Sequence, residues 1–257
     1  MSENQLLEKL SAPIRQAVLE AGVRADRAHA SALYTQGEPI AEVHFPLSGV
    51  FSVILQMENG DQVEALTVGS EGMLGSAAYL LVMRSPFDTI AQIAGATLTI
   101  PVDALLALTR AHAELDEVLR RYTVFEQRMV HQSAACNALH LVEQRLARWL
   151  LMSHDRADGG DTLPLTQEFL AAMLGIRRQS VSQVAHELQR KGLIRYRRGM
   201  VAIIDRDALE GHSCECYAAM RAFYQEMLGA RPSAHDRSEE KRDQSIGNPS
   251  RFRPDIP

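Results

Sequence analysis

The sequence predicts an α+β protein with an N-terminal jelly-roll β-barrel, a long helix and a C-terminal winged helix-turn-helix. Three observations predict this order. Residues 34–101 carry short alternating apolar runs broken by Gly and Pro, a pattern typical of a β-sandwich or jelly-roll barrel. A heptad-spaced apolar stripe follows, and then a basic helix-turn-helix pattern over residues 165–204. The expected parts are 1–112 for the barrel domain with flanking helices, 113–139 for the long helix, 140–229 for the winged domain and 230–257 for a disordered tail.

The composition predicts a soluble protein, and the charge distribution predicts that it binds its partner through one end of the chain. The chain has 257 residues, enough for two domains, and no apolar run approaches the ~18 residues that span a bilayer. Its polar first residues do not resemble a signal peptide, and its three cysteines are too few for a disulfide framework, so we expect a cytoplasmic protein without membrane contact. Residues 1–139 hold nine Lys/Arg and sixteen Asp/Glu, whereas residues 165–204 hold seven and two. This asymmetry favours DNA binding by the C-terminal part.

Residues 1–30 are expected to form short helices, and the barrel region follows them. Within it, Asn59-Gly60 separates two alternating runs, and Asn-Gly is the strongest short hairpin signal. Asp103 is expected to cap a helix over residues 104–108. A barrel of this kind holds either a small ligand or only its own side chains, and the sequence leaves both possibilities open.

The long helix carries an apolar stripe whose members advance by three and four residues over more than three heptads. Such a stripe requires a packing partner. The simplest partner is the same helix of a second subunit, and the alternative is the barrel of the same chain. The stripe also includes Gln132 and Leu139, and the residues expected at a dimer interface are Leu115, Val118, Tyr122, Phe125, Met129 and Cys136.

The helix-turn-helix pattern begins at Thr166, a candidate cap, and turns at Gly175. The second helix has apolar positions at Val181, Val184 and Leu188 and a polar opposite face, which suits the major groove of DNA. A basic hairpin, the wing, follows. Arg178, Gln179 and Gln183 are the candidates for base contact, and the full set of expected DNA contacts is Thr166, Arg177, Arg178, Gln179, Ser180, Ser182, Gln183, Arg197 and Arg198. The alternative is a helical hairpin with a solvated basic face.

No catalytic or metal-binding motif is recognisable. The chain lacks the common hydrolase, metalloprotease and phosphate-binding loop signatures, and its nine histidines show no paired metal spacing. Cys214 and Cys216 have no second pair of ligands nearby in sequence, so they are expected to pack rather than to hold a metal. Two other classes are alternatives. One is a small-ligand-binding barrel whose C-terminal half mediates protein contacts. The other is a cupin-type enzyme, which is disfavoured because only His44 lies in the strand region.

Over residues 30–210 the chain resembles the Crp/Fnr family of bacterial transcription regulators. The resemblance rests on Gly37-Glu38-Pro39, on residues 45–50 (Phe-Pro-Leu-Ser-Gly-Val), on residues 72–75 (Gly-Met-Leu-Gly), on residues 165–168 (Leu-Thr-Gln-Glu) and on residues 175–182 (Gly-Ile-Arg-Arg-Gln-Ser-Val-Ser). It implies a homodimer that binds double-stranded promoter DNA and works with RNA polymerase. It also implies a cyclic-nucleotide-binding-like barrel that senses a signal.

The same resemblance indicates where an effector would bind and which effectors are unsupported. The implied pocket comprises Gly72, Met73, Leu74, Gly75, Arg84 and Ser85. Met73 stands where the cyclic-AMP-binding members have an acid that holds the ribose hydroxyl, so cyclic AMP is not expected. No cysteine precedes Cys136, so the iron–sulfur cluster of the oxygen-sensing members is not expected either. An unidentified small-molecule effector remains open.

Overall fold

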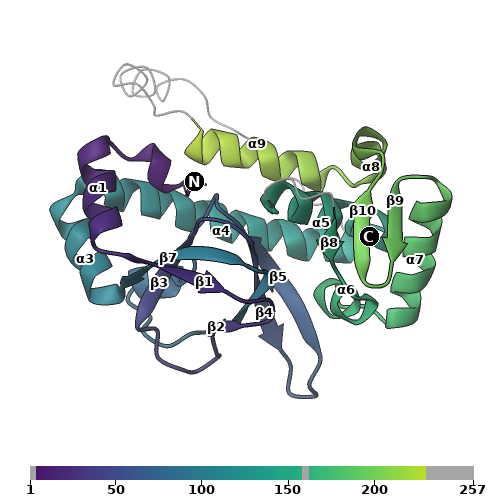
Figure 1. Cartoon of the computed structure of the whole chain (residues 1–257), viewed down its shortest axis with the longest axis horizontal. Helices are drawn as coiled ribbons and strands as arrows, with labels where there is room; N and C mark the ends of the chain where they lie inside the picture. The colour runs from purple at the N-terminus through teal and green to yellow at the C-terminus, as the bar shows by residue number, and fades with distance from the viewer. Residues whose placement is uncertain (1–3, 158–161, 230–257) are drawn as a thin grey trace, which may run out of the picture.

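The N-terminal half folds into two antiparallel sheets, with strand orders β1-β7-β3 and β2-β6-β4-β5. The computed structural model describes residues 4–157 and 162–229 (Figure 1). Alternating apolar side chains such as Phe45, Phe51 and Ile100 are fully buried between the strands. The strands are β1 (Val23–Arg27), β2 (Ala32–Tyr34), β3 (Glu42–Pro46), β4 (Val50–Gln56), β5 (Gln62–Val68), β6 (Asp88–Ile93) and β7 (Gly95–Pro101).

The predicted jelly-roll architecture is confirmed with one correction: the strands form separate sheets and not a closed barrel. The predicted hairpin joins β4 to β5, and Gly60 in its turn has a φ of +88°. Only a residue without a Cβ adopts this left-handed conformation at little cost.

The expectation of helices throughout residues 1–30 is wrong for the last part of that segment. The 3-10 helix η1 (Leu7–Lys9) and helix α1 (Ala12–Glu20) form as expected, but β1 follows and pairs with β7. Strand β1 is polar, with Arg24 and Asp26 on its exposed side. Its pairing therefore depends on backbone hydrogen bonds to β7 more than on an apolar pattern visible in sequence.

Helices α2 (Ser76–Tyr79), α3 (Val102–Ala111) and α4 (Ala113–Leu139) complete this half. The predicted helix near Asp103 is present, but it begins at Val102 with Pro101 as its N-cap. At 1.5 Å per residue α4 is about 40 Å long, and it runs along the sandwich (Figure 1). None of the described helices is long and apolar enough to cross a membrane.

The C-terminal half begins with α5 (Val142–Arg156). It continues through β8 (Leu163–Pro164), α6 (Gln167–Leu174), α7 (Arg178–Arg190), β9 (Ile194–Arg197), β10 (Met200–Ile203) and α8 (Arg206–His212). Helix α9 (Cys216–Leu228) then runs back along α4 towards the N-terminal domain (Figure 1). Phe125 of α4 stacks on Phe223 of α9 at a ring distance of 6.3 Å and meets Tyr224 edge-on at 5.4 Å. The expected disordered tail, 230–257, lies outside the described residues.

The two halves also meet through side chains of α5. The Trp149 indole donates a hydrogen bond of 2.7 Å to Glu64 of β5, and Arg156 forms an ion pair of 2.6 Å with Glu71. All four side chains are largely shielded from solvent. These contacts hold the C-terminal domain against the sandwich, and they fix the direction in which α7 and the wing face.

Candidate nucleic-acid interface

The turn between α6 and α7 has the two local features that the sequence predicts. The Thr166 side chain accepts a hydrogen bond of 3.1 Å from the backbone N–H of Phe169, which caps α6. Gly175 ends α6 with a φ of +62°, a conformation that favours glycine. The structure therefore gives Thr166, expected among the DNA contacts, a capping role, and it leaves the residue exposed.

Helix α7 separates a packed face from a polar face. Val181, Ala185 and Leu188 are buried against the rest of the domain, whereas Val184, expected among the packed residues, is only partly buried. On the other side Arg177, Arg178, Gln179 and Gln183 are exposed, as is His186. The structure thus brings the three candidate base-reading residues together on one solvent-facing surface.

The remaining predicted contacts on α7 are less accessible. Ser180 and Ser182 are partly buried, and the Ser182 hydroxyl donates a hydrogen bond of 2.7 Å to Gln167 of α6. Ser182 therefore helps to fix the angle between the two helices. Arg178 forms an ion pair of 2.6 Å with Glu168, with 62% and 72% of the two side chains exposed. An ion pair this exposed contributes little, so a phosphate or a base edge is able to replace the carboxylate.

The wing is a three-stranded sheet with the order β8-β10-β9. Arg198 and Gly199 form its two-residue turn with φ values of +52° and +76°, as a type I′ turn requires. The Arg197 and Arg198 side chains are exposed at this tip. Strand β8 was not predicted, because two residues, one of them proline, are too short a pattern to recognise.

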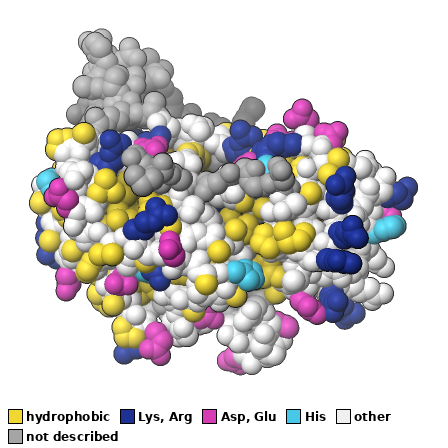
Figure 2. All heavy atoms as spheres, viewed as in Figure 1, with side chains coloured by type: hydrophobic (Ala, Val, Ile, Leu, Met, Phe, Trp, Pro, Cys, Tyr) yellow, Lys and Arg dark blue, Asp and Glu magenta, His cyan; other side chains and the backbone are white. Residues whose placement is uncertain are grey.

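Lys and Arg side chains gather at the end of the molecule formed by α7 and the wing (Figure 2). Seven Lys/Arg and two Glu lie between Leu165 and Ile204. The polar face of α7 and the cationic tip of the wing therefore share one end of the molecule. This arrangement suits a negatively charged groove wide enough to accept a helix.

The apolar stripe of α4 does not face outward, so these residues are not free to form the expected dimer interface. Leu115, Tyr122, Phe125, Met129 and Cys136 are buried within the chain, and Val118 is partly buried. The Tyr122 hydroxyl donates a hydrogen bond of 3.0 Å to the Met73 carbonyl, and Phe125 packs on α9. The correction has a physical reason: a heptad stripe shows that a helix face is covered but does not reveal by what.

A cavity of about 490 Å³ lies between the sandwich and α4. Of the predicted effector residues, Leu74, Gly75 and Ser85 line it, while Gly72, Met73 and Arg84 do not. Met73 is fully buried, and the Arg84 side chain donates to the Gly37 carbonyl at 2.7 Å. Half of the residues implied by the resemblance therefore line this cavity, and the hydrogen bond to Gly37 holds Arg84 away from it.

Sequence reasoning missed the α4 residues of this cavity, which include Val124, Glu126 and His131. Burial raises the pKa of the Glu126 carboxyl to about 7, although a hydrogen bond with Ser76 opposes the shift. Among the described residues that line the cavity none is Lys or Arg. The cavity is thus apolar with one weakly acidic group.

The cysteines are not isolated, which corrects the expectation that nothing completes a ligand set for Cys214 and Cys216. The fold brings Cys136 and His140 to them, with all four ligand atoms within 4.8 Å of one another. A hydrogen bond from Cys214 is the main cause that lowers the pKa of the Cys136 thiol, and the charge of Arg148 adds to the effect. The local signal was the spacing of Cys136 and His140, which stand four residues apart at the end of a helix.

Comparison with known proteins agrees with this geometry. Residues 144–211 match the Crp-like helix-turn-helix domain, and no curated protein matches the chain. A putative Crp/Fnr-family transcriptional regulator from Eubacterium rectale is 18% identical, covers 82% of this chain and 99% of its own, and has a TM-score of 0.62. A CRP-family transcriptional regulator from Thermus thermophilus is 22% identical, with 74% and 96% covered and a TM-score of 0.63.

The global regulator CLP of Xanthomonas campestris, described as responsive to cyclic di-GMP, is 16% identical, with 76% of this chain and 100% of its own covered and a TM-score of 0.63. At these identities the structures show a shared fold. The chain therefore has the fold of the Crp/Fnr transcriptional regulators and carries a Crp-like helix-turn-helix domain in its C-terminal half.

Proposed function

We propose that this protein is a sequence-specific DNA-binding transcription regulator that binds a pseudo-palindromic promoter site as a homodimer and responds to a signal received in its N-terminal domain. The observation that carries the proposal is the exposed polar face of α7 beside the cationic tip of the wing. In this role the protein works with RNA polymerase in the cytoplasm of a bacterium.

The division of labour follows from side-chain chemistry. Arg178, Gln179 and Gln183 have forked or amide groups that match guanine and adenine edges in the major groove. The wing arginines place their positive charges at a hairpin tip, which suits phosphate contact without sequence preference. When Arg178 binds DNA it must give up its ion pair with Glu168. Little free energy is lost, because that ion pair is exposed to solvent.

The homodimer is proposed to form through the other face of α4. Five residues of this face are exposed and advance by three, four, three and four residues, which is heptad spacing: Val124, Gln127, His131, Ala134 and Ala138. Val124 is 48% exposed in the single chain. A second copy of α4 fits this stripe. In a two-fold dimer, the two α7 helices would then be placed so that each enters one of two successive major grooves of the DNA.

The signal is proposed to enter the cavity between the sandwich and α4. Val124, Gln127 and His131 belong both to the cavity lining and to the exposed stripe, so a ligand there would act directly on the dimer contact. An apolar wall with one weakly acidic carboxyl favours a neutral, largely apolar ligand. Cyclic AMP is not proposed, because Arg84 points away and Met73 offers no carboxylate.

The cavity also favours the second candidate, a small-ligand-binding protein whose C-terminal half contacts another protein. An enzymatic activity is not proposed. His44, the strand histidine that a cupin-type site would need, is buried against Thr99 and Arg27, and burial lowers its pKa to about 3 with the Arg27 charge adding. DNA binding separates the first two candidates.

The test is selection of bound duplexes from a random library by the purified full-length protein, followed by affinity measurements on the enriched sequence. We expect a two-fold symmetric motif with half-sites about one helical turn apart and an affinity that falls steeply with salt. A control with both Arg178 and Gln179 replaced by Ala should enrich no motif. Failure to enrich any sequence, with only weak binding that ignores salt, would favour the second candidate.

A further inference from the structure

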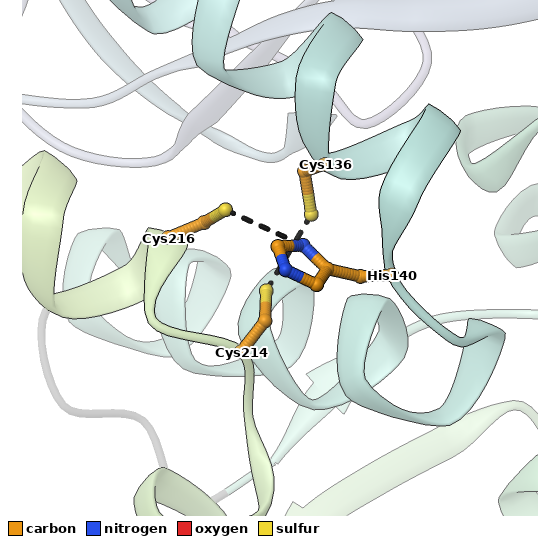
Figure 3. Close-up of side chains that lie close together, drawn as sticks. All are labelled: Cys136, His140, Cys214 and Cys216. Atoms are coloured by element: carbon orange, nitrogen blue, oxygen red, sulfur yellow. Dashed lines mark hydrogen bonds between the residues drawn. The ribbon is translucent and has the colours of Figure 1, made fainter. Parts of the chain in front are cut away.

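Three thiols and one imidazole converge where α4 ends and α9 begins (Figure 3). Cys136 lies in the last turn of α4 and His140 is its C-cap, while Cys214 precedes α9 and Cys216 opens it. The Sγ atoms of Cys136 and Cys214 are 3.5 Å apart, and Cys216 Sγ lies 3.6 Å from His140 Nδ1. All three cysteines are buried. These groups come from segments more than seventy residues apart, so the fold itself assembles them.

The Cys136–Cys214 and Cys216–His140 distances suit a tetrahedral metal ion. With Zn–S bonds of about 2.3 Å and a Zn–N bond of about 2.0 Å, neighbouring ligand atoms of a tetrahedral zinc ion lie roughly 3.5–3.8 Å apart. A disulfide brings two sulfurs to about 2.05 Å, closer than any pair here. An iron–sulfur cluster places several irons and sulfides between its thiolates, and so needs them further apart. We propose that Cys136, His140, Cys214 and Cys216 bind a single tetrahedral zinc ion.

The orientation of His140 supports this assignment. Its Nδ1 faces the thiols, and its Nε2 lies 3.1 Å from the Glu215 carboxylate. A histidine that binds a metal through one nitrogen commonly donates its other N–H to a carboxylate, which fixes the tautomer and the ring. Glu215 stands between two of the cysteines in the chain, so the segment that brings the ligands also brings the group that orients the imidazole.

Two buried arginines beside the cluster supply a second, independent observation. Arg145 and Arg148 are only 7% and 5% exposed. Within residues 4–157 and 162–229 the Nε atom of each has no hydrogen-bond partner. The other guanidinium nitrogens donate to the Leu174 carbonyl, from Arg145, and to the sulfurs of Met152 and Met220, from Arg148. Among the described residues no carboxylate pairs with either guanidinium. A buried cation needs an anionic neighbour.

Thiolates satisfy this need. Three thiolates around one divalent zinc ion leave a net charge of about −1, and the charges of Arg145 and Arg148 act on Cys136 in the described structure. A cluster of neutral thiols would leave both guanidinium groups uncompensated in the interior. The unusual environment of the arginines and the ligand geometry therefore point to the same occupant.

The site would have a structural role. Four protein ligands close the tetrahedron and leave no position for water or substrate, as in structural zinc sites. The ion would join the end of α4 to the start of α9, at the segment between the sandwich and the winged domain. This inference concerns the junction and does not rest on DNA binding, so either proposal can fail alone.

The test is metal analysis of the full-length chain, purified under reducing conditions without an affinity metal. We expect one zinc per chain, and replacement by Co²⁺ should give the thiolate charge-transfer and visible bands of tetrahedral cobalt. Cys136→Ser and Cys214→Ser should lose the ion, whereas His112→Ala at the far end of α4 should keep it. Glu215→Gln, which retains all four ligands, should weaken zinc affinity about 10–100-fold in competition with a chelator.

Three results would overturn the proposal. The first is a reduced, folded wild-type chain that binds neither added Zn²⁺ nor Co²⁺. The second is iron with acid-labile sulfide in place of zinc. The third is unchanged zinc affinity in Glu215→Gln together with full retention of zinc in Cys214→Ser. If the cysteine variants fail to fold, the wild-type stoichiometry, the cobalt spectrum and Glu215→Gln still decide the question.

Discussion

Arg178 and Arg198 carry the same charge but stand in different settings. Arg178 opens α7, next to the exposed Gln179, and its partner Glu168 is exposed. Arg198 occupies a left-handed position in the wing turn with a φ of +52°. This conformation is tolerated better by Asn than by most residues. Asn is therefore the substitution that removes the Arg198 charge and preserves the turn.

We predict that Arg178→Ala lowers affinity for the selected DNA by about 1–3 kcal/mol and relaxes specificity at one base position, because it removes a base contact. Arg198→Asn should weaken binding to all sequences alike and reduce the salt slope by about one unit, because it removes a phosphate contact. Fluorescence anisotropy on specific and random duplexes at several salt concentrations measures both. Equal losses on the two duplexes for Arg178→Ala would contradict its assignment.

Glu126 of α4 makes the folding stability of the chain depend on pH. Burial raises its pKa to about 7 from an ordinary value near 4.5, so the folded chain holds this proton more tightly than the unfolded chain. The stabilising contribution is then complete below about pH 4.5 and is lost as the pH rises towards 7.

We predict that Glu126→Gln becomes more stable relative to the wild type over this pH range, by roughly 1–3 kcal/mol at neutral pH. Urea unfolding at pH 5, 6 and 7.5 measures the difference. Glu117→Gln on the solvent-facing part of α4 is the control and should show no such trend. A stability difference that is flat with pH would mean that Glu126 is solvated in solution.

Sequence patterns predicted which face of a helix is covered better than they predicted which elements cover it. The spacing of Leu115, Tyr122 and Phe125 correctly indicated a covered face of α4, but the covering elements are the sandwich and α9. Helix α9 lies some ninety residues further along the chain, and no local pattern encodes that contact. The polar strand β1 was missed because backbone pairing with β7, not an apolar alternation, holds it.

The helix-turn-helix was recognisable because its determinants are local. A capping threonine, a left-handed glycine and a helix with one apolar face lie within about twenty-five residues. The cysteine cluster lies at the other extreme, since Cys136 and Cys214 meet only when the whole fold is formed. The cysteines and the histidine can be identified in the sequence, but their proximity cannot be predicted because they lie far apart along the chain.

The exposed stripe of α4 leads to a prediction about assembly. Ala134 lies mid-stripe and is exposed in the single chain, so Ala134→Glu would place two carboxylates near each other across the dimer axis. We predict a dimer weakened at least about tenfold, because like charges at an interface are costly. Sedimentation measures this. Ala222→Glu, an exposed position on α9, should leave the dimer intact, and an equal effect of both substitutions would count against the stripe.

Helix α5 joins the winged domain to the sandwich. The Arg156–Glu71 pair is 2.6 Å long with only 11% and 14% of the side chains exposed, and Glu71 also accepts hydrogen bonds from the Gly69 N–H. The Trp149 indole donates to Glu64 on the same surface. An ion pair shielded in this way depends strongly on both partners, because removing one leaves the other uncompensated.

We therefore predict a measurable coupling across the two domains. In a double-mutant cycle of Glu71→Gln and Arg156→Gln, the interaction energy should be about 1–3 kcal/mol by denaturant unfolding. The more solvent-exposed pair Glu117–Arg121 on α4, 3.0 Å apart with 51% and 31% of the side chains exposed, is the control and should give about 0.5 kcal/mol or less. Each single variant should also increase hydrogen exchange in α5, since its end is no longer held to the turn after β5. The contradicting outcome is a coupling energy as small as that of the control together with unchanged hydrogen exchange in α5. It would mean that the winged domain is not held against the sandwich in solution. The direction in which α7 faces would then be set by the DNA.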